Sequence, residues 1–198
     1  MRPEVSRETQ DALQYFAAVL LRWNRTVNLI ARADEQHLWQ RHINDSRQLI
    51  PLMEPLPSHA IDLGSGAGFP GLVLALVSGV HFDLVEADHR KCAFLREAAR
   101  ATGAPVDIHP VRVETATLLP APLVTARAVA PLPRLLEMAV PLLAKGGQCL
   151  FLKGANVAME LTHAGAEWQM QVDRIPSRTD PQASILRICN PTRVLSSA

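Results

Sequence analysis

The spacing of apolar residues along the chain changes near residue 58. Before that point, apolar positions recur at intervals of three and four, which is the period of an amphipathic helix. This pattern predicts one helix from Ser6, a suitable N-cap, to about Ile30, and a second from Asp34 to Ile50. The segment 51–58 contains three prolines, which interrupt helices, and is interpreted as a linker.

Beyond residue 58, short apolar segments typical of buried strands alternate with helical patterns. Such alternation predicts a mostly parallel sheet with helices on both faces. The last two strand patterns are joined by a short polar turn at 178–181, so they must run antiparallel. The expected strands are 59–63, 81–87, 106–110, 123–129, 148–153, 168–175 and 183–189, and the expected helices of this part are 71–78, 90–101 and 132–144.

The 198 residues suit one structural unit made of two parts. We expect a helical extension with a linker at 1–58 and an α/β domain with a seven-stranded sheet at 59–198. The composition, 48% hydrophobic and 20% charged, is that of a globular protein, and the net charge of +1 neither supports nor excludes a nucleic-acid partner.

No apolar segment has the length of a membrane span, and residues 1–4 do not lead into the apolar core of a signal peptide. Cys92, Cys149 and Cys189 lie far apart and form no metal-binding spacing. They are interpreted as free thiols in a reducing compartment, so we expect a cytoplasmic monomer without a metal or a membrane partner.

A glycine loop follows the first expected strand. Asp62-Leu63 ends the strand, and glycines occupy positions 64, 66 and 68. Glycine permits positive φ and lets the backbone approach a ligand closely, and the following helix presents its N-terminal amides to that ligand. Position 69 holds Phe69 instead of the third glycine of dinucleotide enzymes. The spacing resembles the nucleoside loop of S-adenosylmethionine enzymes. In such a loop, Asp62 or its neighbours Gly64, Gly66 and Gly68 would engage the methionine end of the cofactor. A loop that binds NAD or a phosphate is the alternative.

An acid at the end of the next strand supports a nucleoside ligand. Glu86 follows Gly64 by 22 residues, and a carboxylate there can accept both ribose hydroxyls. S-adenosylmethionine and NAD both carry a ribose, so Glu86 does not choose between them. Asp88 is the rival acid, but its place just past the strand favours a helix cap for 90–101.

The absence of certain motifs limits which atom could accept a methyl group from S-adenosylmethionine. Amine methylation of bases commonly uses an Asn- or Asp-Pro-Pro-aromatic motif after the fourth strand, where this chain has TARAVAPL at 125–132. Methylation of cytosine C5 needs a cysteine nucleophile, and Cys92 and Cys149 are poorly placed for that role. The N7 of guanine already has a lone pair and needs no general base, so proximity, orientation and electrostatics suffice. Arg127 and Lys153, at strand ends, could hold guanine O6 or a phosphate.

Several segments, taken in order, resemble one known family. They are Trp23-Asn24, Asn28-Leu29, RHINDS (41–46), DLGSGAGFPGL (62–72), Arg90-Lys91, Phe94-Leu95, Arg112-Val113-Glu114, RAVAPL (127–132) and Leu152-Lys153-Gly154. In these segments the chain is similar to the bacterial small-subunit ribosomal RNA methyltransferase G family, also called glucose-inhibited division protein B. The resemblance implies a Rossmann-like class I S-adenosylmethionine-dependent methyltransferase fold with an antiparallel C-terminal hairpin.

The family resemblance also implies a reaction and a set of cofactor contacts. The reaction is methylation of N7 of a guanine (nucleotide 527) in the 530 loop of 16S rRNA, so the partner is 16S rRNA or the small ribosomal subunit. The implied contacts map to Gly64, Phe69, Val113, Glu114 and Arg127. Glu114 could equally be an exposed cap or an ion-pair residue. A methyltransferase for another RNA or a small molecule, an NAD-dependent oxidoreductase and a binding protein without activity are the alternatives.

The segment ahead of the glycine loop has a polar stripe. Arg41 and Asp45 can pair at i, i+4, and His42 lies between them. These polar groups need partners, either in RNA or in a network that fixes the helix to the sheet. Phe69 is expected to be exposed for stacking on a base. A basic rim could form from Arg32, Arg41, Arg47, Arg90, Lys91, Arg127, Arg134 and Lys153.

Overall fold

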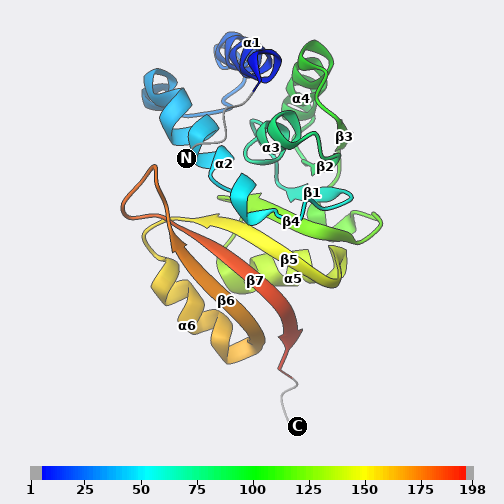
Figure 1. The fold of residues 1–198 in the computed structure, drawn as a ribbon, viewed down its shortest axis with the longest axis vertical. Helices are drawn as coiled ribbons and strands as arrows, with labels where there is room; N and C mark the ends of the chain where they lie inside the picture. The colour runs from blue at the N-terminus through cyan, green and yellow to red at the C-terminus, as the bar shows by residue number, and fades with distance from the viewer. Residues whose placement is uncertain (1–5, 195–198) are drawn as a thin grey trace.

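The computed structural model describes residues 6–194, which form a seven-stranded sheet with helices on both faces (Figure 1). The strands are β1 (Ala60–Leu63), β2 (Phe82–Val85), β3 (Val106–His109), β4 (Ala121–Arg127), β5 (Leu143–Lys153), β6 (Trp168–Pro176) and β7 (Ser184–Arg193). The α-helices are α1 (Arg7–Trp23), α2 (Asp45–Arg47), α3 (Gly71–Ser78), α4 (His89–Thr102), α5 (Leu132–Ala139) and α6 (Val157–Glu167). Short 3₁₀ or π segments are η1 (Arg32–His37), η2 (Trp39–Asn44), η3 (Ile50–Leu52), η4 (Val113–Thr115) and η5 (Val140–Leu142).

The strand order is β3-β2-β1-β4-β5-β7-β6. Strands β1 to β5 pair in parallel, whereas β7 runs antiparallel to both β5 and β6. This confirms the predicted fold class. The chain builds outward from β1 to β3 and then returns to place β4 on the other side of β1. In such sheets, ligands bind beyond the carboxyl ends of the strands where the connections diverge, which here means β1 and β4.

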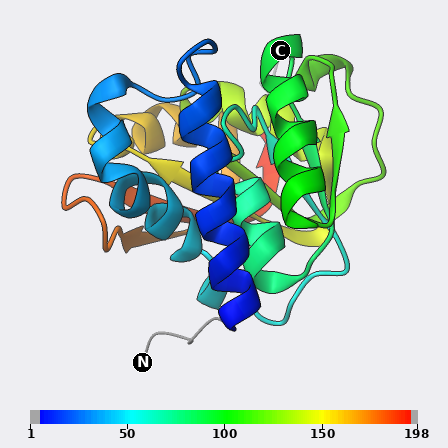
Figure 2. The same ribbon diagram turned by 90° about the horizontal axis from the view of Figure 1, so that it is seen from above.

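Two apolar layers cover the sheet. Helices α1, α3 and α4 pack on one face, with Phe16 and Leu20 of α1 fully buried there, and Figure 2 shows α1 lying beside α4. Helices α5 and α6 pack on the other face around Leu136 and Phe151. The N-terminal segment therefore shares the core of the sheet, although the division of the chain at residue 58 stays a prediction. Among residues 6–194, no helix is both long and apolar enough to cross a membrane.

The first helix is shorter than predicted because Asn24 turns the chain. Its Oδ1 accepts hydrogen bonds from the backbone N–H groups of Leu29 (2.9 Å) and Ile30 (3.0 Å), and its Nδ2 donates to Glu35 (2.7 Å). These bonds satisfy a looped backbone after Trp23, so the apolar spacing continues to Ile30 without helix.

The second predicted helix, Asp34–Ile50, is not one regular α-helix. It is divided into η1, the π-helical η2 and the short α2. The prediction that Arg41 pairs with Asp45 is wrong, because the side chains of these two residues bond to other elements. Arg41 pairs with Asp34 at 2.9 Å, and Asp45 contacts Arg127. Single-turn π segments of this kind often occur at functional sites.

Two further elements near the end of the sheet differ from the prediction. Helix α6 was not predicted, because only Val157 and Ala164 of its residues are buried and its apolar period is weak. Strand β5 starts at Leu143, five residues before the predicted start, at the point where α5 was expected to continue. The link between β3 and β4 contains only the single turn η4 where the other parallel strands are followed by a full helix.

Candidate functional site

The glycine loop has the conformation that its sequence predicts. Gly64, Gly66 and Gly68 have φ of +60°, +56° and +84°, a region that L side chains avoid. A Cβ on Gly64 would lie 2.8 Å from Cγ2 of Val129, which follows β4. The loop therefore needs glycine at position 64 for both conformation and space.

A small cavity of about 270 Å³ lies between the loop and the ends of β2 and β4. The predicted cofactor residues Gly64, Glu86, Val113 and Glu114 all line it. Glu114 also accepts a hydrogen bond from Arg134 (2.7 Å), which supports the ion-pair interpretation of this residue. The remaining lining residues are Val85, Ala87, Val111, Arg112, Val129, Ala130, Arg134 and Met138.

Glu86 fixes the shape of this cavity. One of its oxygens accepts the N–H of Gly66 and the other accepts the N–H of Asp88, each at 2.8 Å. A carboxylate has about four acceptor positions, so two are left for hydroxyl groups of a ligand. Asp88 caps α4 by accepting from the N–H groups of Arg90 and Lys91, as its position after the strand predicts.

Asp62 lies beneath the loop. It lines neither the small cavity nor the larger one described below. Its side chain is fully buried and accepts a 2.7 Å hydrogen bond from Thr125, its register partner on β4. A Cβ on Gly71 would lie 2.5 Å from the Cβ of Asp62, so glycine there lets α3 approach β1 closely. Burial raises the pKa of Asp62 to about 6, although hydrogen bonds from Thr125 and Ser65 oppose the shift. In this structure Asp62 supports the loop from below.

A larger cavity of about 790 Å³ lies at the carboxyl ends of β4 and β5 and shares Val129 and Ala130 with the small one. Five residues selected from the sequence meet here from separate parts of the chain: Arg41, His42, Asp45, Arg127 and Lys153. Other lining residues include Asp34, His37, Gln40, Glu160, Thr179, Asp180 and Pro181. Arg127 lines this cavity and not the smaller one.

The prediction that Phe69 is exposed is wrong. Only 3% of the residue is exposed, because the N-terminal segment and Arg127 cover its ring. The His42 imidazole stacks on Phe69 with the ring centroids 5.0 Å apart, and the Arg127 guanidinium carbon lies 4.9 Å from the Phe69 centroid. Phe16 packs edge-on at 5.5 Å. Phe69 therefore supports the cavity wall and is not free to stack on a base.

His42 is an uncharged group in this wall. Burial, followed by the nearby charge of Arg127, lowers the pKa of His42 to about 4, against the opposing effect of Asp34. Neither ring nitrogen forms a hydrogen bond with another of the residues 6–194, although Asp34 Oδ2 lies 3.6 Å from Nε2. Both nitrogens are buried, so neither is exposed to the cavity in this structure.

A polar network joins the N-terminal segment to the β6–β7 turn. Asp45 places one oxygen 3.4 Å from Nη1 of Arg127, and its other oxygen accepts from Thr179 (2.6 Å) and Gln48 (2.7 Å). Gln48 also accepts the N–H of Arg178 at 2.9 Å. Arg127 donates further to the carbonyl of Arg41 (3.2 Å). The network supports the interpretation that this segment is fixed to the sheet.

Lys153 belongs to a second, almost buried ion pair. Its Nζ lies 2.6 Å from Glu160 on α6 and donates to the carbonyl of Ala130 (2.8 Å). Glu160 also accepts the N–H of Leu132 at the start of α5 (2.7 Å). Only 8% of the Lys153 side chain is exposed, so its main effect is to hold the segment that separates the two cavities.

The predicted basic rim forms only in part. Arg41, Arg127 and Lys153 line the large cavity and Arg134 lines the small one, whereas the other four basic residues lie outside both. Cys92 and Cys149 line neither cavity and are fully buried, and burial raises the pKa of each thiol. Neither cysteine is placed to act as a nucleophile toward a bound base.

Sequence patterns missed several residues of the large cavity. Glu160 lies on the helix that was not predicted, and Thr179 meets Asp45 across 134 positions of sequence. Asp34 was treated only as the start of a helix. Thr125 lies beneath the glycine loop instead of in that cavity. Its contact with Asp62 was predictable, since parallel strands at the centre of the sheet place the two residues side by side.

Solved structures of unlike sequence share this architecture. The N-methyltransferase NodS from Bradyrhizobium japonicum, in complex with S-adenosyl-L-homocysteine, aligns with a TM-score of 0.59 at 14% identity over 94% of this chain and 100% of that one. The cofactor-bound Rv0187 from MTB aligns with a TM-score of 0.63 at 13% identity over 90% of this chain and 89% of that one. The sheet order, the glycine loop and these alignments define a Rossmann-like class I methyltransferase fold.

Sequence comparison identifies the family. The model described as rRNA small subunit methyltransferase G matches residues 9–186. Relatives named ribosomal RNA small subunit methyltransferase G include one from Granulibacter bethesdensis, 56% identical over 96% of this chain and 89% of the relative, and one from Gluconobacter oxydans, 50% identical over 96% and 98%. The chain belongs to the rRNA small subunit methyltransferase G family, which confirms the resemblance seen in its motifs.

Proposed function

We propose that this protein transfers a methyl group from S-adenosylmethionine to N7 of a guanine in 16S rRNA, at nucleotide 527 in the 530 loop. The observation that carries the proposal is the pair of adjoining cavities at the ends of β1, β2 and β4. They share Val129 and Ala130, so a nucleoside held beside the glycine loop would meet a base held in the larger cavity.

The small cavity fits the nucleoside part of the cofactor. Glu86 has free acceptor positions for two ribose hydroxyls, and Val113 and Glu114 lie where the adenine ring would be held. Gly64 lines this cavity, where the methionine end would pass the loop. When bound, S-adenosylmethionine supplies an electrophilic methyl group on a sulfonium. Asp62 is assigned the role of supporting the loop through Thr125 and the close approach at Gly71.

The larger cavity fits a methyl acceptor that need not lose a proton during the reaction. N7 of guanine attacks with its own lone pair, so the chain must orient the base but need not remove a proton from it. Arg127 and Arg41 present guanidinium groups that suit O6 or a phosphate. His42 lines this cavity as a neutral side chain, and Asp45 holds Arg127 in place. Lys153 contributes indirectly, because it donates a hydrogen bond to the carbonyl of Ala130, which lines both cavities.

The decisive experiment uses 30S subunits from a strain that lacks the gene. The purified protein is incubated with them and with methyl-labelled S-adenosylmethionine, and the 16S rRNA is then digested and analysed by mass spectrometry. We expect one N7-methylguanine, located in the 530 loop. Label in another nucleotide, or only in a small molecule, would instead support the alternative of a class I methyltransferase with another acceptor. The cytoplasmic location and the monomeric state stay predictions.

The same assay tests the assignment of Arg127. Arg127→Lys keeps the charge but loses the planar fork that binds guanine O6 or phosphate in two places, so it should reduce the rate at least about tenfold. Arg187→Lys is the matched control, because Arg187 pairs with Asp173 on the exposed part of β6 and β7. Equal rates for the two variants would contradict the assignment.

A further inference from the structure

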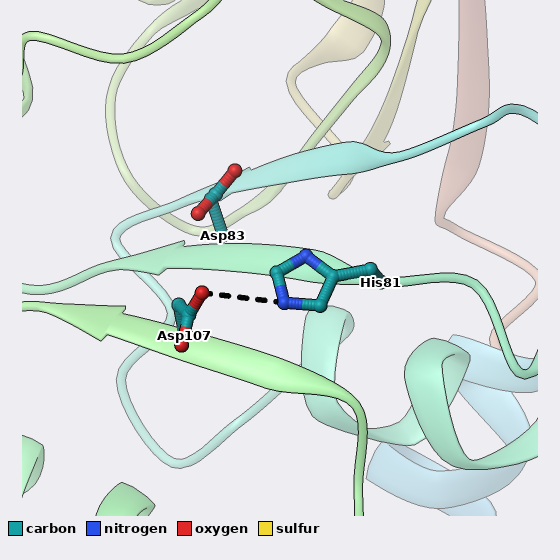
Figure 3. A group of neighbouring side chains, drawn as sticks. All are labelled: His81, Asp83 and Asp107. Atoms are coloured by element: carbon teal, nitrogen blue, oxygen red, sulfur yellow. Dashed lines mark ion pairs between the residues drawn. The ribbon is translucent and has the colours of Figure 1, made fainter.

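A separate group of ionisable side chains lies on β2 and β3 (Figure 3). None of its residues lines either cavity. His81 immediately precedes β2, Asp83 lies within β2 and Asp107 lies within β3. Asp83 and Asp107 are register partners in the parallel pair, so their side chains lie on the same face of the sheet. One nitrogen or oxygen of each of the three residues lies within 4.8 Å of those of the other two.

The distances within this group are close to those of a metal site. Nε2 of His81 lies 3.3 Å from Oδ2 of Asp107. Zn²⁺ binds nitrogen and oxygen at about 2.0–2.2 Å in a tetrahedron, so neighbouring ligand atoms lie about 3.3–3.5 Å apart. Asp83 completes the group, because its ligand atom lies within 4.8 Å of those of the other two residues.

His109, two positions beyond Asp107 on β3, orients Asp83. Its Nε2 lies 2.7 Å from Oδ1 of Asp83, which leaves Oδ2 of this carboxylate for a cation. A hydrogen bond from a second residue to a ligating carboxylate is the usual outer support of protein metal sites. The two strands thus present the pattern His-x-Asp beside Asp-x-His, with all four polar groups on one face.

The face that carries this group is open. The single turn η4 replaces a covering helix between β3 and β4, and 44% of the His81 side chain and 71% of the Asp107 side chain are exposed. Three protein ligands would leave room for water at the remaining position. The imidazole favours a transition metal, since Mg²⁺ and Ca²⁺ prefer all-oxygen ligands.

We propose that His81, Asp83 and Asp107 form a binding site for Zn²⁺ or a similar divalent transition metal, with His109 positioning Asp83. Cysteine spacing could not reveal this site, because its ligands are histidine and aspartate from two strands. The rival interpretation is that His81–Asp107 and His109–Asp83 are only two ion pairs at the sheet edge.

Calorimetric titration with Zn²⁺ distinguishes these interpretations. The full chain carries Cys189→Ser, which removes the only partly exposed thiol among Cys92, Cys149 and Cys189. We expect one Zn²⁺ per chain, and at least about tenfold weaker binding after His81→Gln, since even outer-shell losses cost 10–100-fold in affinity. Zn²⁺ should also raise the midpoint of thermal unfolding of the parent but not of His81→Gln.

The matched control is His163→Gln, on the exposed side of α6, which should bind Zn²⁺ like the parent. Asp107→Asn gives a second test if His81→Gln folds poorly, because the Asp107 side chain is mostly exposed. Absence of saturable binding by the parent, or unchanged affinity in both variants, overturns the proposal. Since none of the three ligands lines either cavity, His81→Gln should methylate rRNA like the parent, so this result is independent of the proposed function.

Discussion

Asp45 and Arg127 meet although 82 positions separate them in the sequence, with a carboxylate oxygen 3.4 Å from a guanidinium nitrogen. The same carboxylate bonds to Thr179, so one side chain holds both an arginine of the cavity and the turn that forms the opposite wall. Asp45 therefore determines where Arg127 points.

Replacing Asp45 by Asn should slow methyl transfer at least about tenfold and should also lower the free energy of unfolding. The substitution keeps an oxygen for Thr179 but removes the charge that holds Arg127, and hydrogen bonds to charged groups contribute about 1.5–3 kcal/mol. Steady-state methylation of 30S subunits measures the effect. Asp173→Asn breaks an exposed pair with Arg187 and should be silent; equal losses in the two variants would show that the position of Arg127 does not matter.

Gly64→Ala should weaken binding of S-adenosyl-L-homocysteine. An alanine there adopts a left-handed φ, which costs about 1–2 kcal/mol, and its Cβ also collides with Val129. Gly103→Ala is the matched control, since Gly103 has φ of +67° with nothing within 4 Å of the added Cβ. Titration calorimetry should find normal affinity for the control and at least about tenfold weaker binding for Gly64→Ala. Similar affinities would mean that the loop does not approach the ligand.

His42 should stay neutral down to a pH near 4, because burial and Arg127 lower its pKa to about 4. The folded-state pKa lies below the unfolded value of about 6.5, so the unfolded chain binds more protons between these values. The free energy of unfolding should therefore fall as the pH drops from about 6.5 toward 4. NMR titration of labelled histidine measures the pKa, and a midpoint near the unfolded value would refute this prediction.

His42→Phe provides the control for that pH dependence. Phenylalanine can keep the stacking on Phe69 but carries no proton, so the part of the pH dependence due to His42 should disappear. Urea unfolding of the parent and the variant at several pH values between 4 and 7 makes the comparison.

Lys153→Met should destabilise the fold by about 3 kcal/mol, because it leaves Glu160 largely buried without its partner. The double variant Lys153→Met/Glu160→Gln should recover part of this loss, since the unpaired charge is then gone and the amide oxygen can still accept from Leu132. Lys145→Met, at an exposed position of the same strand, is the control for chemical denaturation. A parent-like midpoint for Lys153→Met would show that the pair contributes nothing.

The strands and the glycine loop were predictable because their signals are local. Burial of alternating or continuous apolar residues over a few positions defines each strand, and the turn from β1 into α3 needs glycines in a fixed order. The N-terminal segment was less predictable. Apolar spacing cannot distinguish an α-helix from the π segment at Trp39–Asn44, where the contacts of Arg41 and Asp45 with other elements determine the geometry.

The site was predictable where one segment carries it and not where distant segments meet. Glu86 and Gly64 were found from their spacing to the strands. Thr179 and Glu160 carry no local signal, since each acts through a partner brought near by the folded sheet. Phe69 was misjudged for the same reason, because the residues that cover its ring come from other parts of the chain.

The network between Asp45, Gln48 and the β6–β7 turn has a consequence for the order in which the molecule forms during translation. One wall of the large cavity is synthesised early, at 34–45, and the opposite wall, at 179–183, emerges after most of the sheet. Domains generally fold as units, so a unit is complete only when its last segment has left the ribosome. The acceptor cavity therefore forms only after the final hairpin has emerged and docked.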